Sequence, residues 1–221
     1  MMDDVGRLKP LYIIGSGGLG REVAWQVERI NKKQAMWDFK GFIDDNEVLW
    51  NTAAGGYPVL GGCEYLGEQR KDLWTVAAVG NSKAREKVIQ KLELFEHIHY
   101  ATLVDPSVVM SEEVSIGEGS IICVGTIITT NIRIGNHCVI NPACTVGHDA
   151  VLSEFVTLYP GVNVSGNVKI QKNTEIGAGS VIIQGIKIGS DTIVGANSTV
   201  INDIEDEVTV VGSPAKVIKK H

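Results

Sequence analysis

The 221-residue chain lacks the features that mark several large classes of protein. It has no stretch of about 18 uninterrupted apolar residues, so the sequence predicts no membrane-spanning helix. It is poor in positive charge, because 20 Lys and Arg are set against 26 Asp and Glu, and the net charge is -6. This balance argues against a general nucleic-acid-binding protein and leaves any polyanion site to be local.

Two further absences concern the cellular compartment. The first ten residues carry Asp3 and Asp4 and lead to only a brief apolar run, which is not the pattern of a signal peptide. The four cysteines form no CxxC pair, the spacing typical of zinc and redox sites. We therefore expect a reducing, cytoplasmic location and no metal site.

The second half of the chain is dominated by a repeat of six residues. From Ile116 to Val200 every sixth residue is a branched aliphatic, fifteen positions without a break. In an α-helix a step of six residues turns about 600°, which would scatter these side chains over three faces. In an extended chain they all point to one side, together with the mostly small or β-branched residues two places earlier. Short strands separated by corners are typical of a solenoid.

This ladder also determines how two of the cysteines are interpreted. Cys138 and Cys144 occupy the small inward positions, so we expect buried packing residues rather than metal ligands or nucleophiles. Glycine follows six of the ladder positions, which suits corners where the backbone bends sharply.

An unbroken hexapeptide ladder resembles the left-handed parallel β-helix of the hexapeptide-repeat acyltransferases. In that family three hexapeptides make one triangular coil, so the fifteen repeats imply five coils. We expect this β-helix, with a C-terminal tail, to occupy residues 104–221. The alternative, a β-sandwich with chance hydrophobic spacing, would need turn signals every 8 to 12 residues or so instead of a strict six.

Residues 1–103 have the alternating pattern of a small α/β domain. Apolar segments at residues 11–14, 39–43 and 73–79 predict three strands, with one helix after the first and another from about Lys83. This order predicts a small Rossmann-like parallel sheet with a binding crevice at the carboxyl ends of its strands. Ser82 is the expected N-cap of the second helix, and residues 46–62 are expected to form an irregular connection.

A glycine-rich turn, Gly15 to Gly20, follows the first strand and fits the GxGxxG pattern. Such glycines let the backbone approach phosphates at a helix N-terminus. Fewer than about 95 residues precede the solenoid, which leaves room for one mononucleotide half, so a nucleotide-sugar diphosphate suits the site better than a dinucleotide. The alternative is that these glycines only pack the sheet tightly.

The glycine turn, the two acids after the second strand and Gly-Asn after the third, followed by a hexapeptide helix, resemble one group of enzymes. It comprises the sialic acid O-acetyltransferases and nucleotide-aminosugar N-acetyltransferases of bacterial glycan synthesis. The resemblance implies that the N-terminal domain binds the nucleotide-sugar substrate. The implied substrate-binding residues are Gly17, Gly18, Leu19, Asp44, Asp45, Gly80 and Asn81. Leu19 stands where the group often has a His, which removes one polar contact to the ligand.

His148 follows the corner glycine Gly147 and is expected to point out of the coil. In the resembling group a His followed by an acid at this place is the general base that deprotonates the acceptor, a role that suits the near-neutral titration of imidazole. Asp149 would fix the tautomer of that imidazole, and Asn141 would help place the acceptor or the oxyanion. His137 also lies at a corner but precedes no acid, so its loss is expected to change almost nothing.

The resemblance further implies acetyl-CoA as co-substrate, bound in the cleft between parallel helices of a homotrimer, with each site built from two chains. The implied cofactor contacts are Thr157, Ala178, Ala196 and Lys216, where Thr157 replaces a frequent family His. The ending from Gly212 to Lys216 looks like the Gly-x-Pro-Ala-Lys ending of these enzymes. Its lysines would meet the phosphates of coenzyme A, unless they form only a solvated basic tail.

The sequence thus predicts an acetyl-CoA-dependent acetyltransferase that acts on the 4-amino group of a nucleotide-linked amino sugar. Direct transfer is expected, because no cysteine lies at an outward corner beside His148. Three alternatives stay open at this point: an O-acetyltransferase of a sialic-acid-type sugar, a non-catalytic nucleotide-sugar-binding trimeric scaffold, and an oxidoreductase that uses the glycine turn for NAD.

Overall fold

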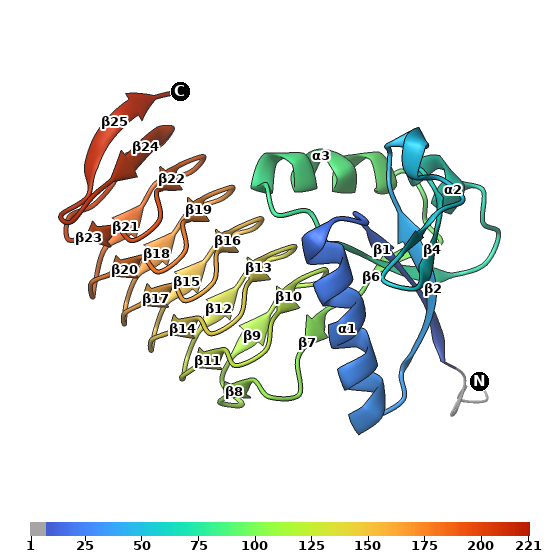
Figure 1. The fold of residues 1–221 in the computed structure, drawn as a ribbon. Coiled ribbons are helices and arrows are strands. Elements are labelled where there is room, and N and C mark those ends of the chain that lie inside the picture. The colour runs from blue at the N-terminus through green and yellow to red at the C-terminus, as the bar shows by residue number, and fades with distance from the viewer. Residues whose placement is uncertain (1–7) are drawn as a thin grey trace. The chain divides into compact units, whose positions relative to one another are not determined.

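The structure of the chain, a computed structural model that describes residues 8–221, divides into two units (Figure 1). The first extends to Val79 and includes Lys87–Ala101, and the second comprises Gly80–Glu86 and Thr102–His221. The sequence-based division at residue 103 did not anticipate that Gly80–Glu86 belong with the second unit. The signal-peptide prediction rests on N-terminal residues outside the described ones. No helix within residues 8–221 is long and apolar enough to cross a membrane.

The first unit is built on a six-stranded sheet with the order β3-β4-β2-β1-β5-β6. Its strands are β1 (Lys9–Ile14), β2 (Trp37–Ile43), β3 (Ala53–Ala54), β4 (Tyr57–Gly61), β5 (Leu73–Ala77) and β6 (Ile98–Tyr100). All neighbours pair in parallel except β3 and β4, which form an antiparallel pair. The helices are α1 (Gly18–Lys33), the 3-10 turn η1 (Glu47–Leu49), α2 (Cys63–Gly67) and α3 (Ser82–Leu92), whose first turn belongs to the second unit.

Apolar burial explains this sheet and corrects one prediction. The side chains of Leu11 and Ile13 in the central strand β1 are fully buried, as is Val23 on the inner face of α1. The expectation of an irregular connection over residues 46–62 is wrong, because this segment contains β4. Val59 in β4 is only 1% exposed and pairs with Phe42, so its burial brings the segment into the sheet.

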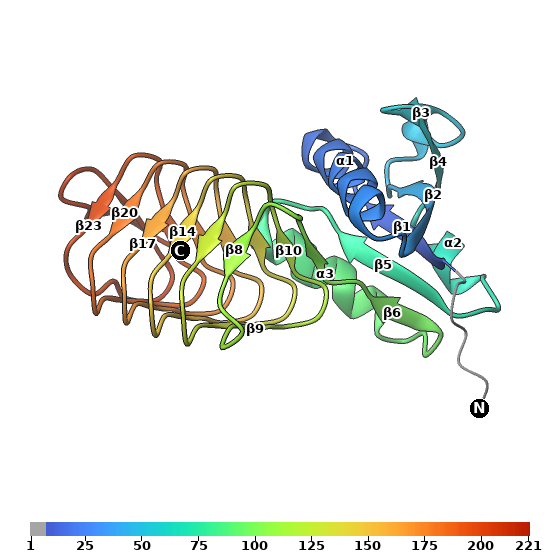
Figure 2. The ribbon, with the colours of Figure 1, turned by 90° about the horizontal axis from the view of Figure 1, so that it is seen from below.

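The second unit is a parallel β-helix, visible as a row of stacked coils in Figure 2. Its first sheet contains β7 (Leu103–Val104), β10 (Ile121–Ile122), β13 (Val139–Ile140), β16 (Thr157–Leu158), β19 (Glu175–Ile176), β22 (Ile193–Val194), β24 (Val208–Val211) and the antiparallel β25 (Lys216–Lys220). Its second sheet contains β8 (Val109–Met110), β11 (Ile127–Ile128), β14 (Thr145–Val146), β17 (Asn163–Val164), β20 (Val181–Ile182) and β23 (Thr199–Val200). Its third sheet contains β9 (Ser115–Ile116), β12 (Arg133–Ile134), β15 (Val151–Leu152), β18 (Lys169–Ile170) and β21 (Lys187–Ile188).

The hexapeptide ladder forms the core of these coils, as predicted. Each ladder residue is the second residue of a strand, and the ladder from Ile122 to Val200 forms one buried cluster. The small inward positions are buried as well. The thiols of Cys138 and Cys144 donate to the carbonyl oxygens of Ser153 and Tyr159. Burial raises the pKa of these two thiols to about 12 and about 11, which confirms their role as packing residues.

The start of α3 differs from the prediction by one residue. The side-chain oxygen of Asn81 accepts from the backbone N–H of Ala84 at 2.9 Å, so Asn81 is the N-cap. Ser82 instead directs its hydroxyl to the carbonyl of Asn173 and the carboxylate of Glu175, both at 2.9 Å. The sequence could not separate these two neighbours, because both are good capping residues and the partners of Ser82 lie some 90 residues away.

Candidate active site

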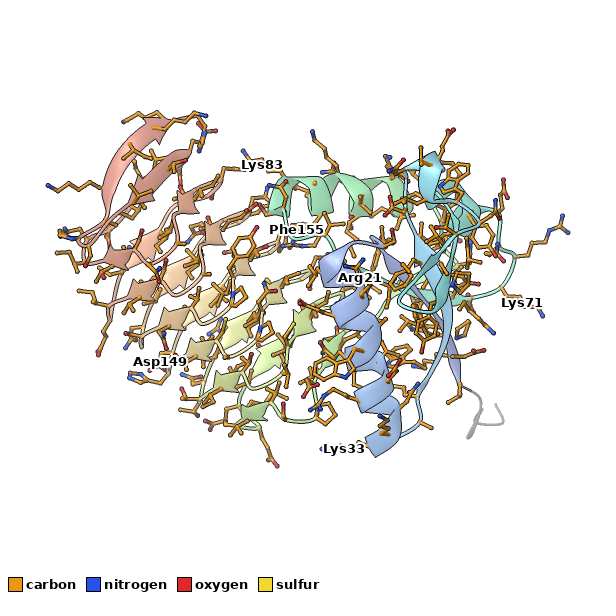
Figure 3. All side chains as sticks on the ribbon, in the orientation of Figure 1. Arg21, Lys33, Lys71, Lys83, Asp149 and Phe155 are labelled. Atoms are coloured by element: carbon orange, nitrogen blue, oxygen red, sulfur yellow. The ribbon has the colours of Figure 1, made fainter. Side chains whose placement is uncertain are left out.

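One corner of the β-helix, between β14 and β15, carries His148 and Asp149. Asp149 is labelled in Figure 3. Asp149 has a φ of +60°, the left-handed region in which Asp and Asn are among the most frequent residues other than glycine. The Nδ1 atom of His148 lies 2.8 Å from Oδ2 of Asp149. The two side chains are 51% and 42% exposed, so the pair lies on the outside of the coil.

This geometry assigns the imidazole nitrogens. An ionised carboxylate only accepts hydrogen bonds, so Nδ1 of His148 carries a proton, and in the neutral imidazole Nε2 then has the lone pair. The hydrogen bonds from His148 and from Asn131 hold the pKa of Asp149 below its ordinary value, so this carboxylate is anionic at neutral pH. An exposed imidazole with an oriented free nitrogen can remove a proton from a bound acceptor.

Two residues that the sequence reasoning missed complete this corner, one coil to either side. Asn131 donates through its amide nitrogen to Oδ1 of Asp149. A Cβ atom at Gly166 would lie 2.5 Å from Cε1 and Nε2 of His148, so a larger residue here would push the imidazole out of its present position. The signal that could have found them is a spacing of eighteen residues, one coil, from Asp149 and from His148.

Asn141 lies at the opposite end of β14 from His148. It is only 7% exposed, and its amide nitrogen donates to the carbonyl of Leu158 in the next coil at 2.8 Å. One chain therefore does not bring Asn141 and His148 together. The exposed corner residues Ala178 and Ala196 lie on the same edge of the helix as Asn141, one coil apart from each other, and Lys216 is exposed at the start of β25.

Thr157 does not lie where a cofactor contact requires it. Its side chain is fully buried in β16, where its hydroxyl accepts from Arg85 at 2.9 Å and donates to the carbonyl of Gly80 at 3.0 Å. Within one chain this hydroxyl holds the turn before α3, and a contact between Thr157 and the cofactor stays a prediction that its burial does not favour.

Arg85 is the centre of that attachment. The buried guanidinium donates to the carbonyl oxygens of His137 at 2.8 Å, Phe155 at 2.9 Å and Gly80 at 3.1 Å. Burial lowers the pKa of Arg85 to about 10, so the side chain stays protonated at neutral pH. It therefore fixes the first turn of α3 on the corners of the β-helix.

The same contact corrects the interpretation of His137. This histidine is 5% exposed, and its ring stacks on Phe155 with centroids 5.2 Å apart. Burial, and secondarily the charge of Arg85, lower the pKa of His137 to about 4. His137 is therefore a neutral core residue, so its loss should lower stability, and the small expected effect on turnover stays a prediction.

A buried carboxylate holds the predicted substrate residue Asn81. Oε1 of Glu175 in β19 accepts from Asn81 Nδ2 at 2.9 Å and from the backbone N–H of Ser82 at 2.8 Å. Oε2 accepts from the hydroxyl of Tyr159 at 3.1 Å. Burial, and then Glu175, raise the pKa of Tyr159 to about 12. Gly80 and Asn81 thus belong to the second unit, where the side chain of Asn81 is already engaged.

The first unit has a hollow of about 540 Å³ at the carboxyl ends of β1 and β2. Ser16, Gly17, Arg21 and Asp44 contribute to its lining. Oδ2 of Asp44 accepts from the backbone N–H of Ser16 at 3.0 Å and from its hydroxyl at 2.7 Å. Although partial burial raises the pKa of Asp44, these bonds hold it below its ordinary value. Asp44 therefore presents a fixed negative charge to the hollow.

Asp45 points elsewhere. Its carboxylate accepts from the backbone N–H of Cys63 at 3.0 Å and pairs with Lys91 at 2.9 Å. Among the described residues, Asp45, Gly18 and Leu19 are absent from the lining of the hollow. Of the two acids, Asp44 therefore lines the hollow, and Asp45 forms an ion pair; substrate binding by either stays a prediction.

The glycine turn divides into two halves with different causes. A Cβ atom at Gly15 or Gly20 would meet a backbone oxygen at 2.8 Å or 1.9 Å, so close packing requires glycine at both. A Cβ atom at Gly17 or Gly18 would meet nothing within 4 Å, and neither residue has a positive φ. Packing explains the outer glycines of the turn, whereas the inner two leave open space at the N-terminus of α1.

Comparison with known proteins agrees with both units. Residues 10–92 match the PglD N-terminal domain family, and residues 167–202 match the bacterial transferase hexapeptide family (six repeats). The chain is 31% identical to GDP-perosamine N-acetyltransferase of Escherichia coli O157:H7 over 173 residues, which cover 78% of this chain and 77% of that protein. The chain belongs to the GDP-perosamine N-acetyltransferase family.

Solved structures of this kind extend over almost the whole chain. A histidine mutant of perosamine N-acetyltransferase from Caulobacter crescentus, in complex with CoA and GDP-perosamine, is 28% identical with a TM-score of 0.86. That match covers 97% of this chain and 99% of the other. The acetyltransferase domain of PglB from Neisseria gonorrhoeae FA1090, in complex with acetyl coenzyme A, is 27% identical with a TM-score of 0.86, covering 96% and 100%. Family membership makes the chain an acetyltransferase rather than an oxidoreductase or a non-catalytic scaffold, and it confirms the predicted fold class.

No group of three or more His, Cys, Asp or Glu side chains within residues 8–221 could hold a metal ion.

Proposed function

We propose that the chain transfers the acetyl group of acetyl-CoA to the amino group of a nucleotide-linked amino sugar, with the 4-amino group as the acceptor. The observation that carries this proposal is the exposed His148–Asp149 pair, with Nε2 of His148 free, in a chain of the GDP-perosamine N-acetyltransferase family. Acetyl-CoA supplies the activated acetyl group. O-acetylation of a sialic-acid-type sugar is the second candidate, because a hydroxyl needs the same base.

The chain's own residues have distinct roles in this reaction. Nε2 of His148 takes the proton of the acceptor nitrogen as that nitrogen attacks the thioester carbonyl, and Asp149 holds Nδ1 and stabilises the imidazolium. The carbon–sulfur bond then breaks, the acetyl group stays on the nitrogen as an amide, and the imidazolium returns the proton to the departing thiolate of coenzyme A. Asn141 helps to place the acceptor or the oxyanion. Transfer is direct, because the four cysteines of the described chain are all buried and none is available as a nucleophile.

The hollow of the first unit is the proposed site for the nucleotide. The N-terminus of the 16-residue α1 and the open space at Gly17 and Gly18 suit the diphosphate. Asp44 is suited to accept hydrogen bonds from ribose hydroxyls, because its carboxylate is ionised and fixed by Ser16. The complex of the Caulobacter enzyme with GDP-perosamine supports a ligand of this class.

The proposed cofactor path runs along the second unit. Ala178 and Ala196 are small and exposed at successive corners, which leaves room for the pantetheine chain of coenzyme A. The exposed lysines of β25, Lys216, Lys219 and Lys220, provide positive charge for its phosphates. A homotrimer would complete the site, because the corner with His148 and the corner with Asn141 lie at opposite ends of β14.

The test combines a substrate panel with one substitution. Nucleotide-linked 4-amino sugars, their 4-hydroxy analogues and unlinked sugars are each incubated with acetyl-CoA, and mass spectrometry detects products heavier by one acetyl group. Alkaline treatment then separates a stable amide from a labile ester. His148→Ala should lower kcat/KM by about 10²- to 10⁴-fold, because a general base is lost.

His99→Ala is the matched control, because His99 also pairs with an exposed acid, Asp72, at 3.3 Å. This variant should keep the wild-type rate. Near-normal turnover of His148→Ala at pH 7 would remove His148 from the mechanism. Acetylation of unlinked sugars only would contradict the nucleotide site in the first unit.

A further inference from the structure

Both oxygens of the Asp149 carboxylate have a separate partner. Oδ2 accepts from Nδ1 of His148, and Oδ1 accepts from the amide nitrogen of Asn131, one coil away. A carboxylate that is 42% exposed would otherwise rotate among several rotamers in water. The bond from Asn131 selects the rotamer in which the second oxygen reaches the imidazole.

The stacking of the coils brings these side chains together. Asn131, Asp149 and Asn167 occupy the same corner position in three consecutive coils, with φ values of +57°, +60° and +57°. Backbone bonds hold the corners in register, since Asp149 N–H donates to Thr130 O at 3.2 Å and Asn167 N–H donates to His148 O at 2.8 Å. Side chains at this position therefore line up along the helix axis.

We propose that Asn131 is a positioning residue for the general base. It holds Asp149 so that His148 keeps its proton on Nδ1 and presents Nε2 to the acceptor. This inference rests on the proposed role of His148. The chemistry is a chain of two hydrogen bonds, from Asn131 to Asp149 and from His148 to Asp149, that leaves no freedom in the carboxylate.

A purely structural reason for asparagine at this place must be separated from that role. Asparagine tolerates a positive φ, and Asn167, Asn173 and Asn197 occupy other corners in the same conformation. Within the described part of the chain, the side chain of Asn167 makes no hydrogen bond, whereas that of Asn131 binds Asp149. The bond, and not the backbone conformation, distinguishes Asn131.

Two substitutions give opposite orders of damage under the two explanations. Asn131→Asp keeps the shape and the tolerance of positive φ but replaces a donor by an anion beside Asp149. Asn131→Ala removes the donor without adding a charge, but alanine is strained at the positive φ of this position. A positioning role therefore makes Asn131→Asp the worse variant for catalysis, because two like charges repel, and a structural role makes Asn131→Ala the worse variant.

The measurement is the pH profile of kcat/KM with acetyl-CoA and the best nucleotide sugar of the panel. Asn131→Ala should lower kcat roughly tenfold with KM changed by less than about twofold. The acidic limb of its profile should move to lower pH, because an anion that is no longer aligned stabilises the imidazolium less. Asn131→Asp should lower kcat near pH 7 by about a hundredfold.

Asn167→Ala and Asn167→Asp are the controls, and both should stay within about twofold of wild type. In an Asp149→Asn background, Asn131→Ala should cause no further loss. The proposal is overturned if Asn131→Ala is more damaging than Asn131→Asp, or if the loss is undiminished in the Asp149→Asn background. If His148→Ala is inactive while both Asn131 variants turn over normally, only the positioning role fails. If His148→Ala itself is active, His148 is not the general base, and the proposed function loses the observation that supports it.

Discussion

His148 and His137 both lie at corners of the β-helix, but the first is exposed and the second is buried because their neighbours differ. The ring of His148 lies beside Gly166 and is exposed to solvent, and its Nδ1 is hydrogen-bonded to Asp149. His137 is stacked on Phe155 and lies beside the guanidinium of Arg85, which comes from 52 residues earlier in the chain. The position of a residue on the coil therefore does not determine its burial by itself.

The burial of His137 predicts an acid-sensitive stability. Between about pH 6.5 and pH 4 the unfolded chain binds a proton on His137 while the folded chain does not, because burial lowers the pKa of His137 to about 4. Stability is therefore lost as pH falls through this window, by at most about 3 kcal/mol. His137→Asn, which tolerates the positive φ of this corner, should be less stable at pH 7.5 and lose less on acidification.

Urea unfolding of both proteins at pH 7.5 and pH 5 measures this difference. Equal losses on acidification in wild type and His137→Asn would show that other groups set the acid response.

Much of the corner could be read from the sequence, and the missing part has a physical cause. His148 and Asp149 are adjacent, so their pairing is local and visible in the order of residues. Asn131 and Gly166 are each a full coil away from their partners, and only the pairing register places them there. The sequence could not tell which of Asp44 and Asp45 lines the hollow. Asp45 instead pairs with Lys91, which lies far away in the sequence, in α3.

The start of helix α3 is attached to the β-helix by buried polar contacts. A single buried cation, Arg85, satisfies carbonyl oxygens of three separate segments, at Gly80, His137 and Phe155. Glu175 holds the same turn through the backbone N–H of Ser82. The Gly80–Asn81 turn is therefore fixed by long-range polar contacts rather than by its own sequence.

Replacement of Arg85 should be costly. Arg85→Ala should lower the free energy of unfolding by about 3 kcal/mol or more, because several buried carbonyl oxygens lose their donor. Lys83→Ala is the control in the same helical turn, since the side chains of the Lys83–Asp191 ion pair are 54% and 29% exposed and the pair should contribute less than about 1 kcal/mol. Urea denaturation followed by circular dichroism gives both values. A loss below about 1 kcal/mol in Arg85→Ala would mean that water replaces the guanidinium at no cost.

The elements of the β-helix were the easiest to predict, and those of the connections the hardest. The ladder of branched aliphatics from Ile116 onward sets strand positions by itself, because each coil buries its residue on the next. β4 was missed because its five residues include Pro58 and Gly61, which are unfavourable in a strand. The burial of Val59 outweighs that local preference.

At the scale of the whole molecule, the outward faces of the second and third β-helix sheets differ in character. The second sheet presents Val109, Ile127 and Val181, which are 63%, 45% and 38% exposed. The third sheet presents charged residues such as Arg133, Lys169 and Lys187. Thr145, Asn163 and Thr199 share this face with the apolar residues. Exposed apolar side chains are typical of protein interaction surfaces, which makes the second sheet the place to test the proposed trimer.

The proposed trimer can be tested on this face. Light scattering should give a mass three times that of the 23.8 kDa chain. Ile127→Lys, on the second sheet, should reduce this mass and abolish activity, because each proposed site needs two chains and buried lysine is unfavourable. Val151→Lys is the matched control on the third sheet and should leave the trimer intact. A single-chain mass for the wild-type protein at assay concentration would refute the assembly.

Because the coils stack without interruption, the number of coils between two residues sets their distance along the axis of the second unit. Each coil adds one strand spacing of about 4.8 Å along the axis. The number of coils after His148 therefore sets how far the base stands from the lysines of β25. Duplication of one eighteen-residue coil would keep the aliphatic residues stacked in register. It would lengthen the distance from His148 to the lysines of β25 by one strand spacing. A fold of this kind can change the reach of its site without changing the chemistry at the corner.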